Sequence, residues 1–270
     1  MISLDLRRHS AFIQFFLAFH IAALLGCLIW PTWWIWIVAS LIFLHALLTV
    51  AGLLPTCALL GPNITRLPKD AAARGEIAIT IDDGPDPIVT PQVLQILREH
   101  GARATFFCIG ERAQAHGDLC REIIAAGHTI ENHGQRHRTL TSLYGPPGWR
   151  REIGDAQHTL QTLTGQTPLF FRPIAGLRNP FLEPLLQQLG LRLVSWTRRG
   201  YDTRAAEPAR VYEKLTRNLT GGEILLLHDG NASRSAQGIP IILDVLPRLL
   251  DELARRNLKT VTLRDVCTVI

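Results

Sequence analysis

The sequence predicts an α/β domain built on a parallel sheet and preceded by an N-terminal helical hairpin. Over residues 66–270, short β-rich runs alternate with helical patterns, an order typical of a parallel sheet covered by helices. The residues before them differ in composition, because no Asp, Glu, Lys or Arg occurs from His9 to Thr65. We therefore expect two parts, a membrane segment of residues 1–65 and a folded domain of residues 66–270.

The uncharged stretch predicts two transmembrane helices. One membrane-spanning helix needs ~20 apolar residues, so the stretch suits two spans, at about residues 11–29 and 34–54. Tryptophan favours the headgroup level and Pro ends a helix, so the turn is expected at residues 30–34, Trp-Pro-Thr-Trp-Trp. The alternatives are a single span or re-entrant hairpin, a buried core hairpin, and a signal peptide, whose apolar core is only ~7–15 residues long.

Cations on both sides of this stretch predict its orientation. Arg7 and Arg8 precede the first span, and Arg66, Lys69 and Arg74 follow the second. Both ends satisfy the positive-inside rule only if both lie in the cytoplasm. We therefore expect a multi-pass protein of the bacterial inner (cytoplasmic) membrane, with the folded domain on the cytoplasmic face.

Charge and cysteine content exclude some classes of function. Of the formal net charge of +5, residues 1–60 contribute +1 and the domain +4. No basic run with interleaved aromatic residues suggests nucleic acid, and a mildly positive surface suits anionic membrane lipid. The cysteines at positions 27, 57, 108, 120 and 267 form no CxxC pair, which argues against a disulfide framework.

Seven strands and six helices are expected in the domain. The predicted strands are Ile77–Ile81, Ala104–Cys108, His128–Glu131, Leu169–Phe171, Leu191–Ser195, Glu223–Leu227 and Lys259–Thr262. The predicted helices are Pro91–His100, Arg112–Ala126, Trp149–Leu163, Pro180–Leu189, Pro208–Leu219 and Ile241–Arg256. Thr90 is expected to cap the first of these helices, with Pro91 at its first position.

Polar side chains follow the predicted strands. They are Asp82 and Asp83 after the first strand, His133 and His137 after the third, Arg172 after the fourth, Asp202 beyond the fifth and His228 after the sixth. In α/β barrels the chemistry lies at the carboxyl ends of the strands, so these residues should converge. A carboxylate and two histidines beside a second carboxylate are the minimum set for activating water on a metal, which predicts a hydrolase. Singly, each motif also fits a turn, a solvated loop or an N-cap.

The four motifs together resemble those of the NodB-homology polysaccharide deacetylases, carbohydrate esterase family four. The motifs are Thr80-Ile81-Asp82-Asp83-Gly84-Pro85, His133-Gly134-Gln135-Arg136-His137, Arg172-Pro173-Ile174-Ala175-Gly176 and Leu225-Leu226-Leu227-His228-Asp229, in the family's order. The resemblance extends over residues 76–270. It implies a distorted seven-stranded (β/α) barrel and a metal-dependent N-deacetylase.

The resemblance also implies a role for each site residue. Asp83, His133 and His137 are the implied metal ligands, with Zn²⁺ the expected ion. Asp82 is the implied general base, held by Arg172, and His228 the implied general acid, held by Asp202. The backbone N–H of Ala175 is implied to stabilise the oxyanion.

Two motif positions depart from the family pattern. In the fourth motif, Arg199 stands in place of the first of two aspartates and Thr203 in place of a tryptophan, while Asp202 is kept. In the third motif, Ala175 stands where an aromatic residue is usual. These changes remove bulk from the substrate pocket and leave the implied machinery intact.

The substrate expected from this combination is an N-acetylated amino sugar, on a polyprenyl phosphate or similar membrane lipid carrier. Arg198, Arg199 and Arg204 are candidate phosphate contacts, although a solvated loop explains them equally simply. One alternative is a periplasmic or extracellular deacetylase of peptidoglycan or exopolysaccharide. Another is a catalytically silent, membrane-bound saccharide-binding module. His9, His20 and His45 receive no role.

Overall fold

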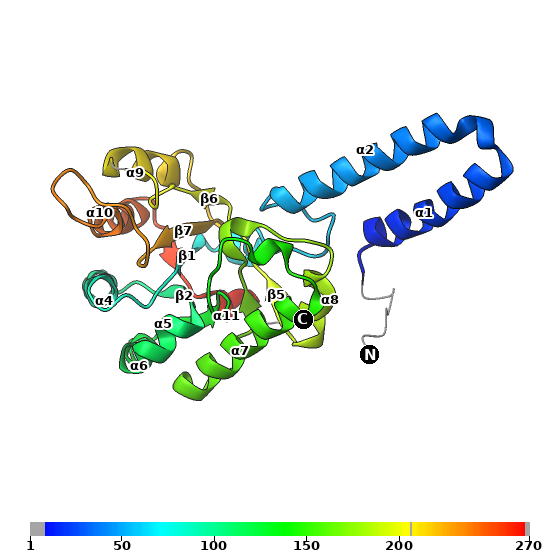
Figure 1. The fold of residues 1–270 in the computed structure, drawn as a ribbon. Coiled ribbons are helices and arrows are strands. Elements are labelled where there is room, and N and C mark those ends of the chain that lie inside the picture. The colour runs from blue at the N-terminus through cyan, green and yellow to red at the C-terminus, as the bar shows by residue number, and fades with distance from the viewer. Residues whose placement is uncertain (1–8, 206, 268–270) are drawn as a thin grey trace.

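The computed structural model describes residues 9–205 and 207–267, which form a helical hairpin attached to a curled α/β domain (Figure 1). The hairpin consists of α1 (Ala11–Ile29), the short 3₁₀ turn η2 (Pro31–Trp33) and α2 (Trp34–Leu53). Both helices are long and apolar enough to cross a membrane. Arg7 and Arg8, on which part of the predicted orientation depends, lie outside the described residues.

The hairpin leaves large apolar side chains uncovered. Leu28 in α1 is 73% exposed and Phe43 in α2 is 71% exposed. In Figure 1 the two helices project away from the rest of the chain, with the turn at their far end. Soluble monomers rarely expose so large a continuous apolar surface. The two helices are exposed and do not form a core, so the alternative of a buried core hairpin is wrong.

The domain is a curled, wholly parallel sheet with the strand order β5-β4-β3-β2-β1-β7-β6, and β8 pairs with β1. Its strands are β1 (Glu76–Asp82), β2 (Ala104–Cys108), β3 (Thr129–Asn132), β4 (Phe170–Phe171), β5 (Arg192–Leu193), β6 (Arg198–Arg199), β7 (Ile224–His228) and β8 (Lys259–Thr260). The seven strands of the main path confirm the predicted distorted barrel. Within the described residues β5 and β6 do not pair with each other, so the barrel is open between them.

All seven predicted strands are present, and the two-residue strand β6 was not predicted. The predicted helices are present as α4 (Val89–Glu99), α5 (Gly110–Ala115), α6 (Gly117–Ala125), α7 (Pro146–Thr164), α8 (Leu182–Gln188), α9 (Pro208–Thr216) and α10 (Ile241–Arg255). Short helical elements α3 (Lys69–Ala73), η3 (Thr141–Leu143), η4 (Ile174–Gly176) and α11 (Leu263–Cys267) were not predicted.

Two details of the helix prediction were wrong. Thr90 lies inside α4 and not at its N-cap, because Asp86 accepts the N–H groups of Ile88 and Val89 at 2.9 and 2.8 Å and starts the helix earlier. The helix expected over residues 112–126 is two helices, because His116 has a φ of −131° and breaks it.

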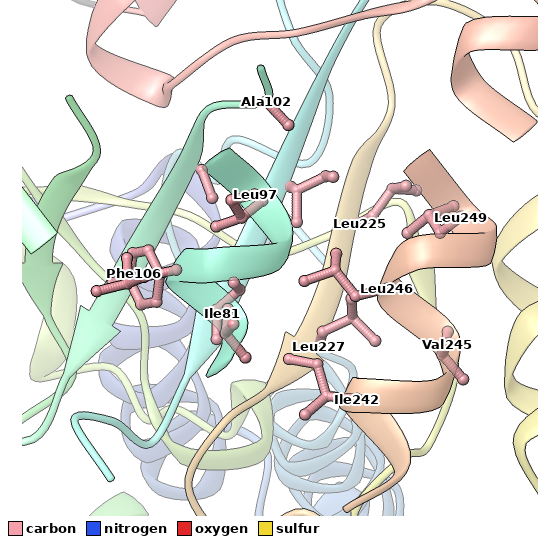
Figure 2. Packing of buried hydrophobic residues seen from close by; sticks show 14 of the residues in the cluster. Ile81, Leu97, Ala102, Phe106, Leu225, Leu227, Ile242, Val245, Leu246 and Leu249 are labelled. Atoms are coloured by element: carbon pink, nitrogen blue, oxygen red, sulfur yellow. The ribbon is translucent and has the colours of Figure 1, made fainter. Parts of the chain in front are cut away.

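The main core lies between the sheet and the helices α4 and α10. Figure 2 shows Leu246 and Ile242 of α10 beside Leu227 of β7, and Leu97 of α4 above the neighbouring strands. Strands β1, β2 and β7 are buried on both faces, which explains their continuous apolar sequences. Packing of these buried strands sets the positions of their carboxyl ends.

The chain that leaves the hairpin lies in the opening of the barrel. Ile64 donates its N–H to Leu193 O at 3.0 Å and accepts the N–H of Ser195 at 2.9 Å, so it pairs in parallel with Val194 at the end of β5. Thr65 O accepts a hydrogen bond from Thr197 Oγ1 at 2.8 Å. The connection between hairpin and domain is therefore part of the barrel wall.

Candidate active site

The predicted site residues converge at the carboxyl ends of the strands. Asp82 ends β1 and His228 ends β7, and these two positions are paired in the parallel register. His133, Arg172 and Asp202 follow β3, β4 and β6. Asp82, His133, His137 and His228 line one cavity of about 210 Å³, whereas Arg172 and Asp202 are fully buried behind Asp82 and His228. The sheet register thus brings together residues that lie nearly 150 positions apart.

Asp83, His133 and His137 offer three ligand atoms to one point. Asp83 Oδ1 lies 3.1 Å from His133 Nε2 and 2.9 Å from His137 Nε2, and the three ligand atoms lie within 4.8 Å of one another. Asp83 Oδ1 is buried, yet none of these close approaches has hydrogen-bond geometry. An unsatisfied carboxylate oxygen facing two imidazole nitrogens fits a divalent metal ion, because all three atoms present lone pairs.

Second contacts hold these ligands in place. His133 Nδ1 lies 2.7 Å from Arg172 O, which keeps the proton on Nδ1 and leaves Nε2 free for a metal. Asn231 Nδ2 donates to Asp83 Oδ2 at 3.1 Å. The buried Glu152 accepts the N–H of His137 at 3.1 Å and so holds the histidine loop.

The electrostatics of Asp83 agree with a ligand role. Burial alone would raise the pKa of Asp83, but the imidazoles of His133 and His137 outweigh burial and lower it far below its usual value. The carboxylate therefore stays ionised at every physiological pH. Its φ of 73° is unusual for a residue with a side chain and is set by the turn that follows β1.

Asp82 lies beside the proposed ligands and is held by Arg172. Arg172 Nη1 donates to Asp82 Oδ1 at 2.7 Å and to Thr80 Oγ1 at 2.8 Å, and Nη2 donates to Ser195 O at 2.8 Å. Arg172 is fully buried, and its guanidinium lies 4.1 Å from the centroid of the Phe107 ring. Only one oxygen of Asp82 is tied to the arginine. The other, Oδ2, lies 3.8 Å from His133 Nε2.

His228 and Asp202 form the second charged pair of the cavity. Asp202 Oδ1 lies 2.8 Å from His228 Nδ1, and Asp202 Oδ2 accepts the backbone N–H of His228 at 2.7 Å. Burial alone would lower the pKa of His228, but the Asp202 carboxylate outweighs it and raises the pKa above its usual value. Asp202 orients the ring and favours its protonated form.

Ala175 lines the same cavity from the loop after β4. Its φ is 52°, a left-handed conformation in the short turn η4. The next residue, Gly176, has a φ of 74°, and a Cβ there would lie 2.4 Å from Cβ of Pro55. The loop that carries Ala175 therefore packs directly on the chain that follows α2.

The three arginines that were candidate phosphate contacts have different surroundings in the structure. Arg198 is paired with Glu223 and with the carbonyls of Arg217 and Asn218, so it stabilises the barrel wall. Arg204 is exposed. Arg199 alone lines the cavity. Sequence reasoning missed Glu152 and Asn231, which stand outside the motifs, and also Trp196, which lines the cavity.

Comparisons with known proteins decide the family. A sequence profile described as polysaccharide deacetylase matches residues 69–194. A peptidoglycan-N-acetylglucosamine deacetylase of Bacillus cereus is 34% identical over 192 residues, which cover 70% of this chain and 87% of that protein. The chain belongs to the polysaccharide deacetylase family. It is therefore related to hydrolases that act on amide bonds of amino sugars, as the motifs predicted.

Two further relatives agree in sequence and in fold. A chitooligosaccharide deacetylase of Azorhizobium caulinodans is 37% identical over 158 residues, 58% of this chain and 75% of that protein. The structure of a family 4 carbohydrate esterase from Streptomyces lividans in complex with acetate is 31% identical and superposes with a TM-score of 0.62, covering 69% of this chain and 91% of that chain. The profile match begins at residue 69, after the N-terminal hairpin.

Proposed function

We propose that this protein is a metal-dependent hydrolase that removes the N-acetyl group from an amino sugar carried on a membrane lipid. The observation that carries the proposal is the grouping around one cavity of a three-ligand cluster, the Asp82–Arg172 pair and the His228–Asp202 pair. Hydrolysis of an amide needs an activated water, a base, an acid and a stabilised oxyanion, and this cavity offers a candidate for each.

Asp83, His133 and His137 would hold the metal, with Zn²⁺ the expected ion because two imidazoles and one carboxylate are a common catalytic zinc set. When bound, such an ion supplies an acidified water and polarises the acetyl carbonyl. The remaining chemistry belongs to the side chains and backbone of this chain.

Asp82 would take the proton of the attacking water through Oδ2, because Oδ1 is tied to Arg172. The water oxygen then bonds to the acyl carbon, and the N–H of Ala175 donates to the oxygen that becomes negative. Collapse breaks the C–N bond, and Nε2 of His228 gives its proton to the departing amine. The products are acetate and a free amino sugar. Asp202 supports that protonated ring from the Nδ1 side.

The position of the hairpin supports a lipid-borne substrate. Arg178 donates its backbone N–H to Gly52 O of α2 at 3.1 Å, and Gly176 lies against Pro55. The loop on the rim of the cavity is thus joined to the end of the second apolar helix. If the hairpin lies in the membrane, the cavity lies close to its surface, and a sugar on a polyprenyl phosphate could reach it without leaving the bilayer.

The cavity wall supports the same substrate. At Ala175 and Thr203 the side chains are small, so few flat surfaces are available on which successive sugar rings could stack. Less binding energy is then available from a long glycan. Confinement of enzyme and substrate to one membrane would compensate by raising their effective concentration.

A polymeric substrate is the second candidate. The relatives named above are a peptidoglycan and a chitooligosaccharide deacetylase, which favours a periplasmic or extracellular glycan. A silent saccharide-binding module is less well supported, because binding alone does not need a base at Asp82 and an acid at His228. Nothing in the charge pattern suggests a nucleic-acid partner.

Metal analysis of purified variants tests the core of the proposal. Asp83→Ala, His133→Ala and His137→Ala should lose bound metal and activity together, because each removes one of three ligands. Asp82→Asn should keep the metal while its deacetylation rate falls roughly 10²–10⁴-fold, the usual effect of losing a general base. Full metal occupancy in His133→Ala would refute the ligand assignment. Loss of metal from Asp82→Asn would mean that ligand and base must be exchanged.

A further inference from the structure

Arg199 is a cation of the active-site cavity that lacks a protein partner. It lies on β6 and lines the cavity, and its Nε is buried without a hydrogen bond. Among the described residues none forms an ion pair or accepts a hydrogen bond from its guanidinium. A guanidinium in partly buried surroundings is costly when nothing neutralises it.

The other cationic side chains at the cavity have acidic partners. Arg172 is paired with Asp82 and His228 with Asp202. Asp83 is the proposed ligand of a cation. Burial lowers the pKa of Arg172, Asp82 opposes this, and the positive charge of Arg199 adds a smaller lowering effect. Arg199 is thus a cationic side chain of the cavity to which the described residues supply no acidic partner.

Arg199 is held in place by aromatic rings. Its guanidinium carbon lies 5.3 Å from the centroid of the Trp196 ring and 5.1 Å from that of Tyr201. These contacts fix the group without consuming its N–H donors. A planar group with free donors matches the oxygens of a phosphate or carboxylate, to which it can form two parallel hydrogen bonds.

We propose that Arg199 binds an anionic group covalently attached to the amino sugar. This inference rests on the proposed deacetylase function and specifies its substrate class. Two sources offer this chemistry, the phosphodiester of a lipid carrier and the carboxylate of an acidic sugar in a glycan. A neutral sugar would leave the guanidinium unpaired in the occupied cavity.

The test compares full-length, detergent-solubilised, metal-loaded protein on three substrates. These are the N-acetylglucosamine phosphodiester of a short prenyl alcohol, the methyl glycoside of N-acetylmuramic acid, and neutral methyl N-acetylglucosaminide. Arg199→Gln should lower kcat/KM roughly 10–100-fold on the anionic substrate that fits, mostly through KM, because a charge-assisted bidentate contact is lost. The loss on the neutral glycoside should stay below about 3-fold.

Arg199→Lys and Arg204→Gln complete the comparison. Lysine keeps the charge without the planar fork, so it should recover part of the loss. Arg204→Gln removes an exposed arginine from the same loop and should leave all three rates unchanged. A selective loss on the phosphodiester identifies the lipid carrier, and a selective loss on the muramic acid glycoside identifies an acidic glycan.

Two outcomes separate failure of this inference from failure of the proposed function. Equal losses of Arg199→Gln on charged and neutral substrates would overturn the anion subsite while leaving a deacetylase. If the wild-type protein releases acetate from none of the three substrates, the deacetylase function itself is overturned, and this inference with it.

Discussion

At the scale of single residues, the best defined pair of the site is His228 and Asp202. Both oxygens of Asp202 are used by His228, one by the ring and one by the backbone N–H. Asp202 is fully buried, so little water screens the interaction. Asp202 is therefore the largest of the causes that raise the pKa of His228, ahead of the more distant carboxylates of Asp82 and Asp83.

This dependence predicts the pH profile of Asp202→Asn. A general acid works only when protonated, so the rate should fall as pH rises through the pKa of His228. Asp202 raises this pKa, so replacing it with a neutral amide should lower the pKa and move the high-pH decline of kcat toward acid. Measurement of kcat against pH in the wild type and the variant tests this. An unchanged high-pH limb would assign that limb to another group.

The residues that the sequence predicted lie inside motifs, where neighbouring residues give a recognisable context. Asp82, Asp83 and His228 sit at strand ends, and strand ends of a parallel sheet meet at one edge. Glu152 and Asn231 were missed because they lie outside any recognisable motif. Glu152 is a single acid in a helix, and its role depends on how α7 packs against the histidine loop, which no local pattern encodes.

At the scale of elements, the connection from the hairpin reaches the catalytic base through Ser195. Ser195 Oγ donates to Pro55 O at 2.6 Å, and its carbonyl accepts from Arg172 Nη2 at 2.8 Å. Arg172 in turn holds Asp82. The segment that follows the hairpin is thus linked to the base through Ser195 and Arg172, and Pro55 also packs against Gly176 in the loop of the proposed oxyanion donor.

We predict that Ser195→Ala lowers kcat about 3–10-fold, the effect of losing one hydrogen bond that positions catalytic groups. KM and metal content should stay within about 2-fold of the wild-type values, because neither the ligands nor the cavity wall is changed. Steady-state kinetics on the full chain with metal analysis and a melting curve tests this.

Asn63→Ala is the matched control. Asn63 Nδ2 donates to the same Pro55 carbonyl at 2.8 Å and to Cys57 O at 3.4 Å. It should therefore leave kcat unchanged. Equal effects of the two substitutions on kcat would show that the hydrogen bonds only stabilise the connection and do not position the base.

Elements that the sequence missed are mostly very short. Strand β6 has only two residues, which pair with Leu225 and Leu226 of β7, so it is too short to carry an alternation that a pattern could reveal. The break at His116 divides a continuous amphipathic pattern into two helices. The first of them, α5, begins beside the histidine loop, where the N–H of Gly110 donates to Gly134 O at 2.9 Å. The long and strongly periodic helix α10 was predicted within one residue of its ends, whereas α7 begins three residues before its predicted start.

At the scale of the whole molecule, the apolar surface of the hairpin predicts behaviour in the cell. Two helices with uncovered side chains such as Leu28 and Phe43 should be held by hydrocarbon and not by surface charge. The protein should therefore stay in the membrane fraction in high salt and in alkaline carbonate. Appearance in the soluble fraction after carbonate, or a mature N-terminus beyond residue 29, would mean a peripheral protein or a cleaved signal sequence.

The membrane side on which the domain lies decides between the two substrate candidates. Arg66, Lys69 and Arg74 follow the second helix, which ends at Leu53, and translocating them with the domain would oppose the positive-inside rule. A lipid-linked sugar is accessible on the cytoplasmic face, whereas a peptidoglycan or exopolysaccharide strand is accessible only outside it.

Alkaline phosphatase fusions in a bacterial host, active only after export, measure that side. A fusion after Thr32, in the turn between the helices, should be active because a cytoplasmic N-terminus places this turn outside. A fusion after Ile270 should be inactive because the second helix returns the chain to the cytoplasm. The first fusion is the control, since its activity shows that the first helix directs export. Strong activity of both fusions would place the catalytic cavity outside the cytoplasm and refute the predicted orientation. It would then favour a cell-wall or exopolysaccharide substrate, because those sugars lie on that side of the membrane.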